Sequence, residues 1–366
     1  MTEANERAAA DLAAIRTAVQ RVIVGQDRMI DRMLLALLTG GHCLLEGVPG
    51  VAKTLAVQTL ATVVDGTFSR LQFTPDLVPS DVVGTRIYRP SSETFDVELG
   101  PVFANIVLAD EINRAPAKVQ SAMLEVMAEQ QVSIGGRSFA VPQPFLVLAT
   151  QNPIESEGVY QLPEAQRDRF LFKISVGYPS QAEEVEIVLR MGAHPVAATP
   201  AVGLERLVRL RELVADVYTH HSVVDYAVRI VAATRAPQLA GMPDLAGMLA
   251  YGAGPRGSLG LVAAARALAV LRGRHHITPA DIRDVGEDVL THRLVLSFDA
   301  LADGVDSADI VRRVLATVPQ PDAGQPPPPP RPAPVTLEPE PGPPVTASGL
   351  GPWAVPSGPF RAAGRG

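Results

Sequence analysis

Short apolar runs recur through the first half of the chain, and each is followed by a sequence typical of a helix or a turn. Five of these runs have the length of buried strands. Buried strands that alternate with helices predict an α/β fold, with a parallel sheet covered by helices on both faces. The predicted strands are residues 42–46, 68–72, 105–110, 145–151 and 170–176.

Two hairpins interrupt this alternation. Residues 132–134 and 139–141 are short strand-like runs on either side of a turn that begins with Gly135-Gly136. A second, weaker hairpin pattern spans residues 87–99. Both hairpins are predicted to be insertions into the α/β region.

The pattern becomes helical after Pro179. Ser180 and Glu183 form a capping box, and Thr278-Pro279 gives a helix an N-cap and a proline at its first position. We therefore expect an α/β domain over residues 1–178 and an all-helical domain over residues 179–318. Helices are predicted from 180 to about 190, from 279, and over 204–218, 223–234, 258–272 and 306–316.

Proline marks a third region. About half of the chain's 33 prolines lie in residues 319–366, including the run 326–330. Polyproline segments stay extended and solvated, and this segment has few apolar residues to bury. We expect residues 319–366 to form a disordered tail, which would carry the only tryptophan, Trp353.

Composition excludes several classes of protein. The net charge of −7 argues against an extended nucleic-acid surface, and the single cysteine, Cys43, excludes a disulfide framework and a cysteine-rich zinc site. No apolar run is long enough to cross a bilayer, and the first residues lack a signal-peptide pattern. A cytoplasmic protein without membrane insertion is the expectation.

A glycine-containing loop lies between the first predicted strand and a helical run. Such a loop wraps phosphates with its backbone N–H groups at the start of a helix. Lys53 would reach the β- and γ-phosphates, and the Thr54 hydroxyl would bind Mg²⁺. Ala52 stands where the motif usually has glycine, and it is small enough to fit if its φ is negative. The loop and the next helical residue are Gly47, Val48, Pro49, Gly50, Val51, Ala52, Lys53, Thr54 and Leu55.

Polar residues follow two later strands. Asp110 and Glu111 end the strand at 105–110, where Asp110 could hold Mg²⁺ and Glu111 could orient or deprotonate the attacking water. With the phosphate loop upstream, this pair indicates nucleotide hydrolysis rather than two solvated acids. After the strand at 145–151, either Thr150 or Asn152 could contact the γ-phosphate or the water, although spacing alone favours a plain strand exit.

Three arginines are candidates for stabilising a transferring phosphoryl group. Arg167 and Arg169 lie just before the strand at 170–176, where a surface ion pair with Asp168 is the alternative. Arg256 lies at a helix start in the second domain. The helix dipole slightly disfavours a cation there, which weakly indicates an anionic partner.

In this order, the motifs resemble those of the MoxR family of AAA+ ATPases over about residues 22–318. Ala52 in the phosphate loop is usual in that family. The motifs are Val24-Gly25-Gln26, Gly47 to Thr54, residues 71–81, Ala109-Asp110-Glu111-Ile112-Asn113-Arg114-Ala115, Ala149-Thr150-Gln151-Asn152-Pro153, residues 157–165 and Gly254-Pro255-Arg256.

The resemblance implies a role for each motif. The loop resembles Walker A, and Asp110 with Glu111 resembles Walker B, with Glu111 as the catalytic acid. Asn152 resembles sensor 1, and Gly25 with Gln26 resembles the segment that flanks the adenine. Arg169 resembles the arginine finger that reaches a neighbouring subunit's ATP. Arg256 resembles sensor 2, on a helical lid that closes onto the γ-phosphate.

One departure affects the finger. The position before Asp168 is usually aliphatic in the family, but it is Arg167 here, so Arg167 and Arg169 compete for the role. Arg114 is a further candidate for a contact between subunits. The two predicted hairpins match family insertions that would line the centre or face of a ring.

The resemblance implies Mg²⁺-dependent ATP hydrolysis by a homo-hexameric, head-to-tail ring. Turnover would drive chaperone-like remodelling or maturation of a protein client, together with a von Willebrand factor A (VWA) domain protein. One alternative is a nucleic-acid motor, which the lone Arg137 of the hairpin at 132–141 and the net charge of −7 disfavour. Another is a nucleotide-gated scaffold with little turnover, which the intact Asp110, Glu111 and Asn152 disfavour.

Overall fold

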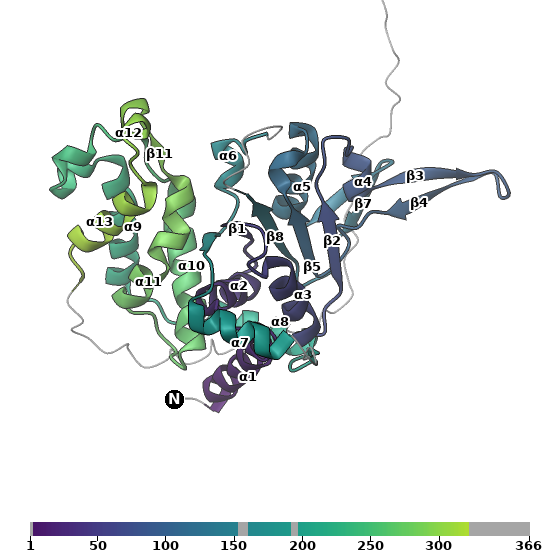
Figure 1. Ribbon diagram of the computed structural model, residues 1–366, viewed down its shortest axis with the longest axis horizontal. Helices are drawn as coiled ribbons and strands as arrows, with labels where there is room; N and C mark the ends of the chain where they lie inside the picture. The colour runs from purple at the N-terminus through teal and green to yellow at the C-terminus, as the bar shows by residue number, and fades with distance from the viewer. Residues whose placement is uncertain (1–2, 153–159, 192–196, 322–366) are drawn as a thin grey trace, which may run out of the picture. The chain divides into compact units, whose positions relative to one another are not determined.

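The computed structural model describes residues 3–152, 160–191 and 197–321, which belong to one compact unit (Figure 1). Part of the motif at 157–165 and nearly all of the predicted tail, with Trp353, lie outside the described residues. The predicted division at residue 178 falls inside this unit and stays a prediction.

Five parallel strands form the central sheet in the order β2-β5-β8-β1-β9. Each begins and ends within two residues of a predicted strand, so the α/β prediction is confirmed. Because the strands are parallel, their carboxyl ends share one edge of the sheet. The strands are β1 (Cys43–Gly47), β2 (Phe68–Gln72), β5 (Ile106–Asp110), β8 (Leu146–Gln151) and β9 (Phe172–Val176).

Alternate residues of the central strands β1, β5 and β8 pack into different cores. Ile106 and Leu108 of β5 join one apolar cluster with helices α1 (Glu3–Gln20), α2 (Asp27–Thr39) and α3 (Lys53–Val63). Val107 and Ala109 join a second cluster with helix α5 (Ala117–Glu129). Successive side chains of a strand point to opposite faces of the sheet, and both faces are covered here. Nearly every position of a central strand is therefore buried, which explains its continuous apolar sequence.

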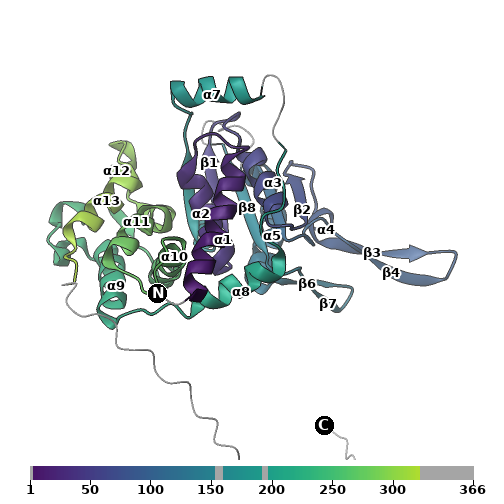
Figure 2. The same cartoon turned by 90° about the horizontal axis from the view of Figure 1, so that it is seen from below.

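Both predicted hairpins are present, on the side of the sheet away from helices α9 to α13 (Figures 1 and 2). β6 (Gln131–Ile134) pairs with β7 (Arg137–Ala140), and the longer β3 (Gly84–Arg89) pairs with β4 (Thr94–Leu99) after the short helix α4 (Pro79–Val83). The two hairpins touch at Gly135, where an added Cβ would lie 2.0 Å from Cδ of Arg86.

The second half of the chain is mainly helical, as predicted. A short antiparallel pair, β10 (Leu249–Tyr251) with β11 (Val295–Leu296), corrects the all-helical expectation, because runs this short carry no detectable period. The helices are α6 (Glu164–Arg167), α7 (Gln181–Met191), α8 (Leu204–Ala215), α9 (His221–Arg235), α10 (Pro255–Leu271), α11 (Pro279–Leu290), α12 (Phe298–Ala302) and α13 (Ser307–Thr317). Four single 3₁₀ turns accompany them in the described ranges: Ile112–Arg114, Pro237–Ala240, Pro243–Leu245 and Thr291–Arg293.

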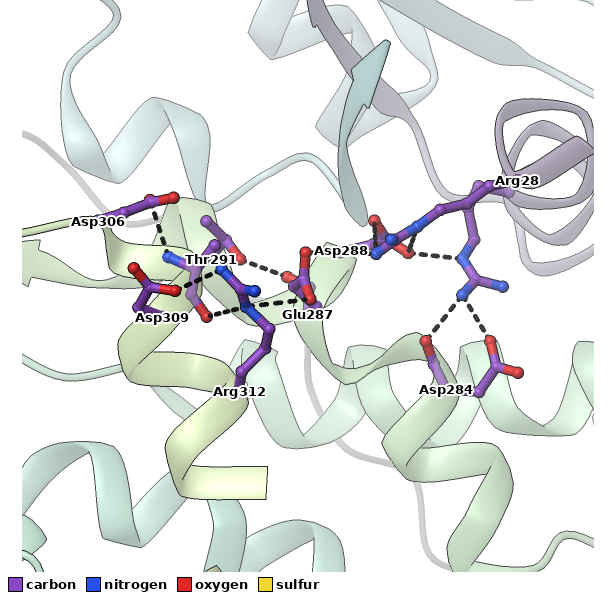
Figure 3. Close-up of polar contacts among 10 residues, drawn as sticks. Arg28, Asp284, Glu287, Asp288, Thr291, Asp306, Asp309 and Arg312 are labelled. Carbon is purple, nitrogen blue, oxygen red and sulfur yellow. Dashed lines mark hydrogen bonds and ion pairs between the residues drawn. The ribbon is translucent and has the colours of Figure 1, made fainter. Parts of the chain in front are cut away.

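Ion pairs join α2 of the α/β region to α11 of the helical region. Nε of Arg32 donates to Oδ2 of Asp288 at 2.7 Å, and Arg28 donates to the same carboxylate at 2.8 Å. Arg32 also bonds Asp284 at 2.6 Å (Figure 3 shows Arg28, Asp284 and Asp288). The side chains of Arg32 and Asp288 are only 6% and 4% exposed, so this junction is buried. None of the helices in the described part of the chain is apolar over a bilayer-spanning length.

Candidate functional site

The phosphate loop connects the end of β1 to the start of α3. Gly50 has a φ of 86°, and nothing lies within 4 Å of the Cβ it lacks, so the loop is open on that side. Ala52 has a φ of 61°, so the condition that its φ be negative is not met. The loop turns into the helix through the left-handed region at this position, which costs an L-residue roughly 1–2 kcal/mol. The alanine therefore occupies a conformation that suits glycine.

Lys53 folds back on this loop. Its Nζ donates a hydrogen bond to the carbonyl of Gly47 at 2.5 Å. Partial burial lowers the pKa of Lys53, and the negative charges of Asp110, Glu111 and Glu46 oppose that shift. The amine is thus held at the loop among carboxylates, at the place where the motif puts phosphate. Thr54 and Leu55 follow in the first turn of α3, and both are half-buried.

Asp110 is held on both carboxylate oxygens. The hydroxyl of Thr150, from neighbouring β8, donates to Oδ1 at 2.6 Å, and Arg70, from β2, donates to Oδ2 at 2.6 and 3.0 Å. The same hydroxyl accepts from the N–H of Glu111 at 2.8 Å. Thr150 therefore fixes the end of β5, and because its proton is given to Asp110 it cannot donate to the γ-phosphate in this arrangement. Asn152, the other candidate, lies buried just beyond β8.

The Glu111 carboxylate is also held. Its Oε2 accepts a hydrogen bond from Nε2 of Gln72 at 2.7 Å and pairs with Nε of Arg114 at 3.0 Å. Arg114, a candidate for contact between subunits, therefore lies against Glu111 of its own chain. Sequence reasoning missed Gln72 and Arg70. Their position near the end of a predicted parallel strand was the available signal, because such ends share an edge.

Gly25 and Gln26 reach the same edge of the sheet. Nε2 of Gln26 donates to the carbonyl of Gly177, directly after β9, at 3.0 Å. The backbone of Gly47 approaches that of Val176 closely, since an added Cβ at Gly47 would lie 2.4 Å from the Val176 oxygen. The structure thus gathers Gly25, Gln26 and the phosphate loop at the carboxyl edge, where β5 and β8 also end.

Arg169 lies at the opposite, amino edge. The N–H of Leu171 bonds the carbonyl of His42, the residue before β1, at 2.8 Å. β1 and β9 are paired in parallel, with Cys43 beside Phe172 and Gly47 beside Val176. Four residue steps of about 3.3 Å put the two edges about 13 Å apart. This span exceeds the length of an arginine side chain, so Arg169 cannot serve the phosphate loop of its own chain.

Arg256 lies with Arg169. α10 begins three residues earlier than predicted, and Arg256 in its first turn pairs with Oδ2 of Asp168 at 3.3 Å. Arg169 and Arg256 both line a cavity of about 360 Å³. The expected placement of Arg256 over its own chain's γ-phosphate is therefore wrong, because the start of α10 packs against the segment before β9. Arg167 does not line this cavity, and its buried Nε has no hydrogen bond among the described residues.

Comparisons with known proteins agree with this architecture. The model of the ATPase family associated with various cellular activities (AAA) matches residues 42–172, and the AAA lid domain model matches residues 245–314. Chaperone MoxR1 of Mycobacterium tuberculosis is 62% identical over 309 residues, which cover 84% of this chain and 82% of that protein. The chain belongs to the MoxR family of AAA+ ATPases.

More distant relatives share most of their length with this MoxR-family chain. Protein MoxR of Paracoccus denitrificans is 33% identical, over 84% of this chain and 95% of that protein. A crystal structure of a candidate ATPase from Cytophaga hutchinsonii superposes with a TM-score of 0.82 at 43% identity, and covers 86% of this chain and 96% of the other. The α/β core with a helical lid is therefore the fold of the family.

The carboxyl edge of this MoxR-family fold fits a magnesium nucleotide. Its open loop and the amine of Lys53 suit phosphate oxygens. The Thr54 hydroxyl and the Asp110 carboxylate are oxygen donors, which Mg²⁺ prefers, and Mg²⁺ usually takes its remaining ligands from phosphate and water. Arg70 occupies one Asp110 oxygen, so direct coordination through that oxygen would displace the arginine.

Proposed function

We propose that the chain hydrolyses ATP with Mg²⁺ at sites completed between subunits, and couples turnover to remodelling of a protein client. One observation carries this proposal: each chain holds Lys53 and Glu111 at one edge of its sheet and Arg169 with Arg256 at the other. A head-to-tail neighbour would bring the two halves together. Repeating that contact closes a ring, and the family is one whose members commonly form oligomeric rings.

Each residue then has a chemical role. The loop and Lys53 hold the phosphates, and Thr54 with Asp110 would hold Mg²⁺, which neutralises phosphate charge when it is bound. Glu111 accepts the proton of the attacking water, and Asn152 hydrogen-bonds the γ-phosphate. Arg169 and Arg256 of the neighbour stabilise the charge that develops in the transition state.

In this structure two neighbouring side chains occupy one oxygen of the Glu111 carboxylate. Oε2 is shared by Gln72 and Arg114, which hold the carboxylate in place. Proton abstraction needs a carboxylate oxygen directed at the water. Both donors also draw charge from the carboxylate and weaken it as a base, so turnover should rise when these two contacts loosen, and assembly or client binding is the proposed trigger.

Chaperone-like activity is proposed from the relationship to the protein named Chaperone MoxR1. A VWA-domain partner and a hexameric ring are proposed from the family alone. The exposed Tyr88 and Phe95 lie on the projecting β3–β4 hairpin, which would then be available to contact a client near the ring centre (Figure 1).

A nucleotide-gated scaffold is a second candidate, favoured by the contacts that hold Glu111. The two functions differ in turnover. Phosphate release per chain from Mg-ATP, measured over a wide range of protein concentration, should rise as subunits associate. A rate that is measurable but flat would show that each chain hydrolyses alone. Absence of turnover at every concentration would favour the scaffold.

Mixing variants tests the shared site directly. Arg169→Ala removes one half of the site and Lys53→Ala removes the other, so each variant alone should be inactive. In an equimolar mixture, about a quarter of random interfaces have both halves intact and should regain activity. If the arginine served its own chain, the mixture would stay inactive.

A further inference from the structure

Arg293 is a buried arginine with an unusual set of partners. It lies in the turn after α11, and its side chain is 3% exposed. Its Nε donates to Oδ1 of Asp168 at 2.9 Å, one Nη donates to the carbonyl of Phe170 at 2.6 Å, and the other donates to Leu171 at 3.2 Å. Further bonds reach the carbonyls of Asp168 and Val289.

Nearly all of these acceptors belong to residues 168–171, the segment that carries Arg169. The neighbouring His292 adds a contact to the same segment, since its Nε2 lies 2.9 Å from the carbonyl of Phe170. Two consecutive side chains of this turn, His292 and Arg293, thus hydrogen-bond to the backbone on both sides of Arg169.

Asp168 extends the contact to Arg256. Its Oδ1 accepts from Arg293, and its Oδ2 pairs with Arg256 at 3.3 Å. One carboxylate therefore lies between a buried arginine and an exposed one. Arg293, Asp168 and Arg256 all line the cavity that Arg169 also lines.

Packing alone does not explain why an arginine is buried at this position. Removing a guanidinium from water costs several kcal/mol, and apolar residues of similar size would often fill such a space as well or better. Burial lowers the pKa of Arg293 to about 10, and the charge of Asp168 opposes that shift. The planar guanidinium of an arginine, however, can hydrogen-bond to several acceptors and hold them in one geometry.

We propose that Arg293 is a positioning residue that holds Arg169 and Arg256 as one array, aimed at the nucleotide of the neighbouring subunit. The inference rests on the proposed function, because the array acts only on a second chain. It also links the lid to the finger: any shift of α11 is transmitted through Arg293 to the backbone beside Arg169.

The test uses the full chain with Arg293→Gln and a matched control, Arg274→Gln. Arg274 is a partly buried lid arginine that pairs with Asp281 and does not touch residues 168–171. Misplacing a catalytic group by about 1 Å can cost roughly 10²-fold in rate. We expect Arg293→Gln to lower kcat on that order with KM for ATP little changed, and Arg274→Gln to retain most activity.

Mixing this variant with Lys53→Ala then distinguishes a positioning role of Arg293 from a role in folding. Equimolar Arg293→Gln and Lys53→Ala should regain about a quarter of the wild-type rate, because the Arg293 variant keeps its own nucleotide half and borrows intact arginines. Lack of recovery, while Arg169→Ala with Lys53→Ala recovers, would overturn the proposal by showing general damage. An equal loss in Arg274→Gln, or full activity in Arg293→Gln, would overturn it as well.

Two further outcomes of these experiments also bear on the proposal. If the wild type turns over but Arg169→Ala with Lys53→Ala also fails to recover, the shared site itself is refuted and this inference falls with it. If Arg293→Gln does not fold, Asp168→Asn replaces it, since the amide keeps an acceptor for Arg293 and removes the charge that holds Arg256. That variant should lose kcat and recover with Lys53→Ala in the same way, and parity with wild type would overturn the proposal.

Discussion

Acidification should weaken the core at His42, the residue before β1. The ring is buried, Nδ1 accepts from the N–H of Val147 at 3.0 Å, and Nε2 donates to the carbonyl of Met127 at 3.2 Å. These partners define a neutral ring with its proton on Nε2, because a second proton on Nδ1 would face the Val147 N–H. Phe145 packs edge-on at 5.7 Å. Burial is the main reason that the pKa of His42 falls to about 4.

The direction of the pH effect on stability depends on which state, folded or unfolded, binds the proton at the higher pH. The unfolded chain takes up a proton near pH 6.5, whereas the folded chain resists it down to about pH 4. Stability from His42 is therefore complete above pH 6.5 and is lost as pH falls through this window. At about 1.4 kcal/mol per pKa unit, the full loss is about 3 kcal/mol, of which about 2 kcal/mol falls between pH 7 and pH 5.

Denaturant unfolding of wild type and His42→Asn at pH 7, 6 and 5 measures this effect. Asparagine keeps a donor and an acceptor but does not titrate, so the variant should be less stable at pH 7 and lose about 2 kcal/mol less on acidification. His292 is also buried with a pKa lowered mainly by burial, and it contributes equally to both proteins. Parallel pH profiles for the two proteins would refute the argument.

Three other predictions concern the site and the junction. Glu111→Gln should bind ATP but not hydrolyse it, because the water loses its base; wild-type phosphate release would assign that role elsewhere. Ala52→Gly should keep ATP binding and raise the free energy of unfolding by up to about 1 kcal/mol, since glycine relieves the left-handed strain; a clear fall in melting temperature would contradict this. Asp288→Ala should cost about 1.5–3 kcal/mol in denaturant unfolding, because buried Arg32 keeps only Asp284 as a charged partner, and Asp284→Ala, at a more exposed partner, should cost less; equal losses would contradict the burial argument.

The sheet and its carboxyl edge were accessible from sequence for a physical reason. Strands covered on both faces must be apolar throughout, so their ends are visible where polar residues such as Asp110 begin. Parallel pairing then determines that all of these ends meet, which brings Glu111 to the phosphate loop without further information.

Other features depend on long-range placement. The position of Arg256 depends on how the start of α10 packs against the segment before β9, which no local pattern contains. The backbone of Ala52 depends on the path from the loop into α3. Arg293 left one local signal: an arginine between the apolar pairs Val289-Leu290 and Leu294-Val295 must find buried partners, although the sequence does not say which.

The lone cysteine has a practical consequence. Cys43 is fully buried, and burial raises its pKa far above the range where thiolates form, so it should not react with maleimides while the chain is folded. A cysteine placed at exposed Ser91, in the turn between β3 and β4, would then be the sole reactive thiol. Fluorophores attached there need no engineered cysteine-free background. If copies assemble as proposed, energy transfer between labelled copies would report how these turns approach one another when nucleotide is added.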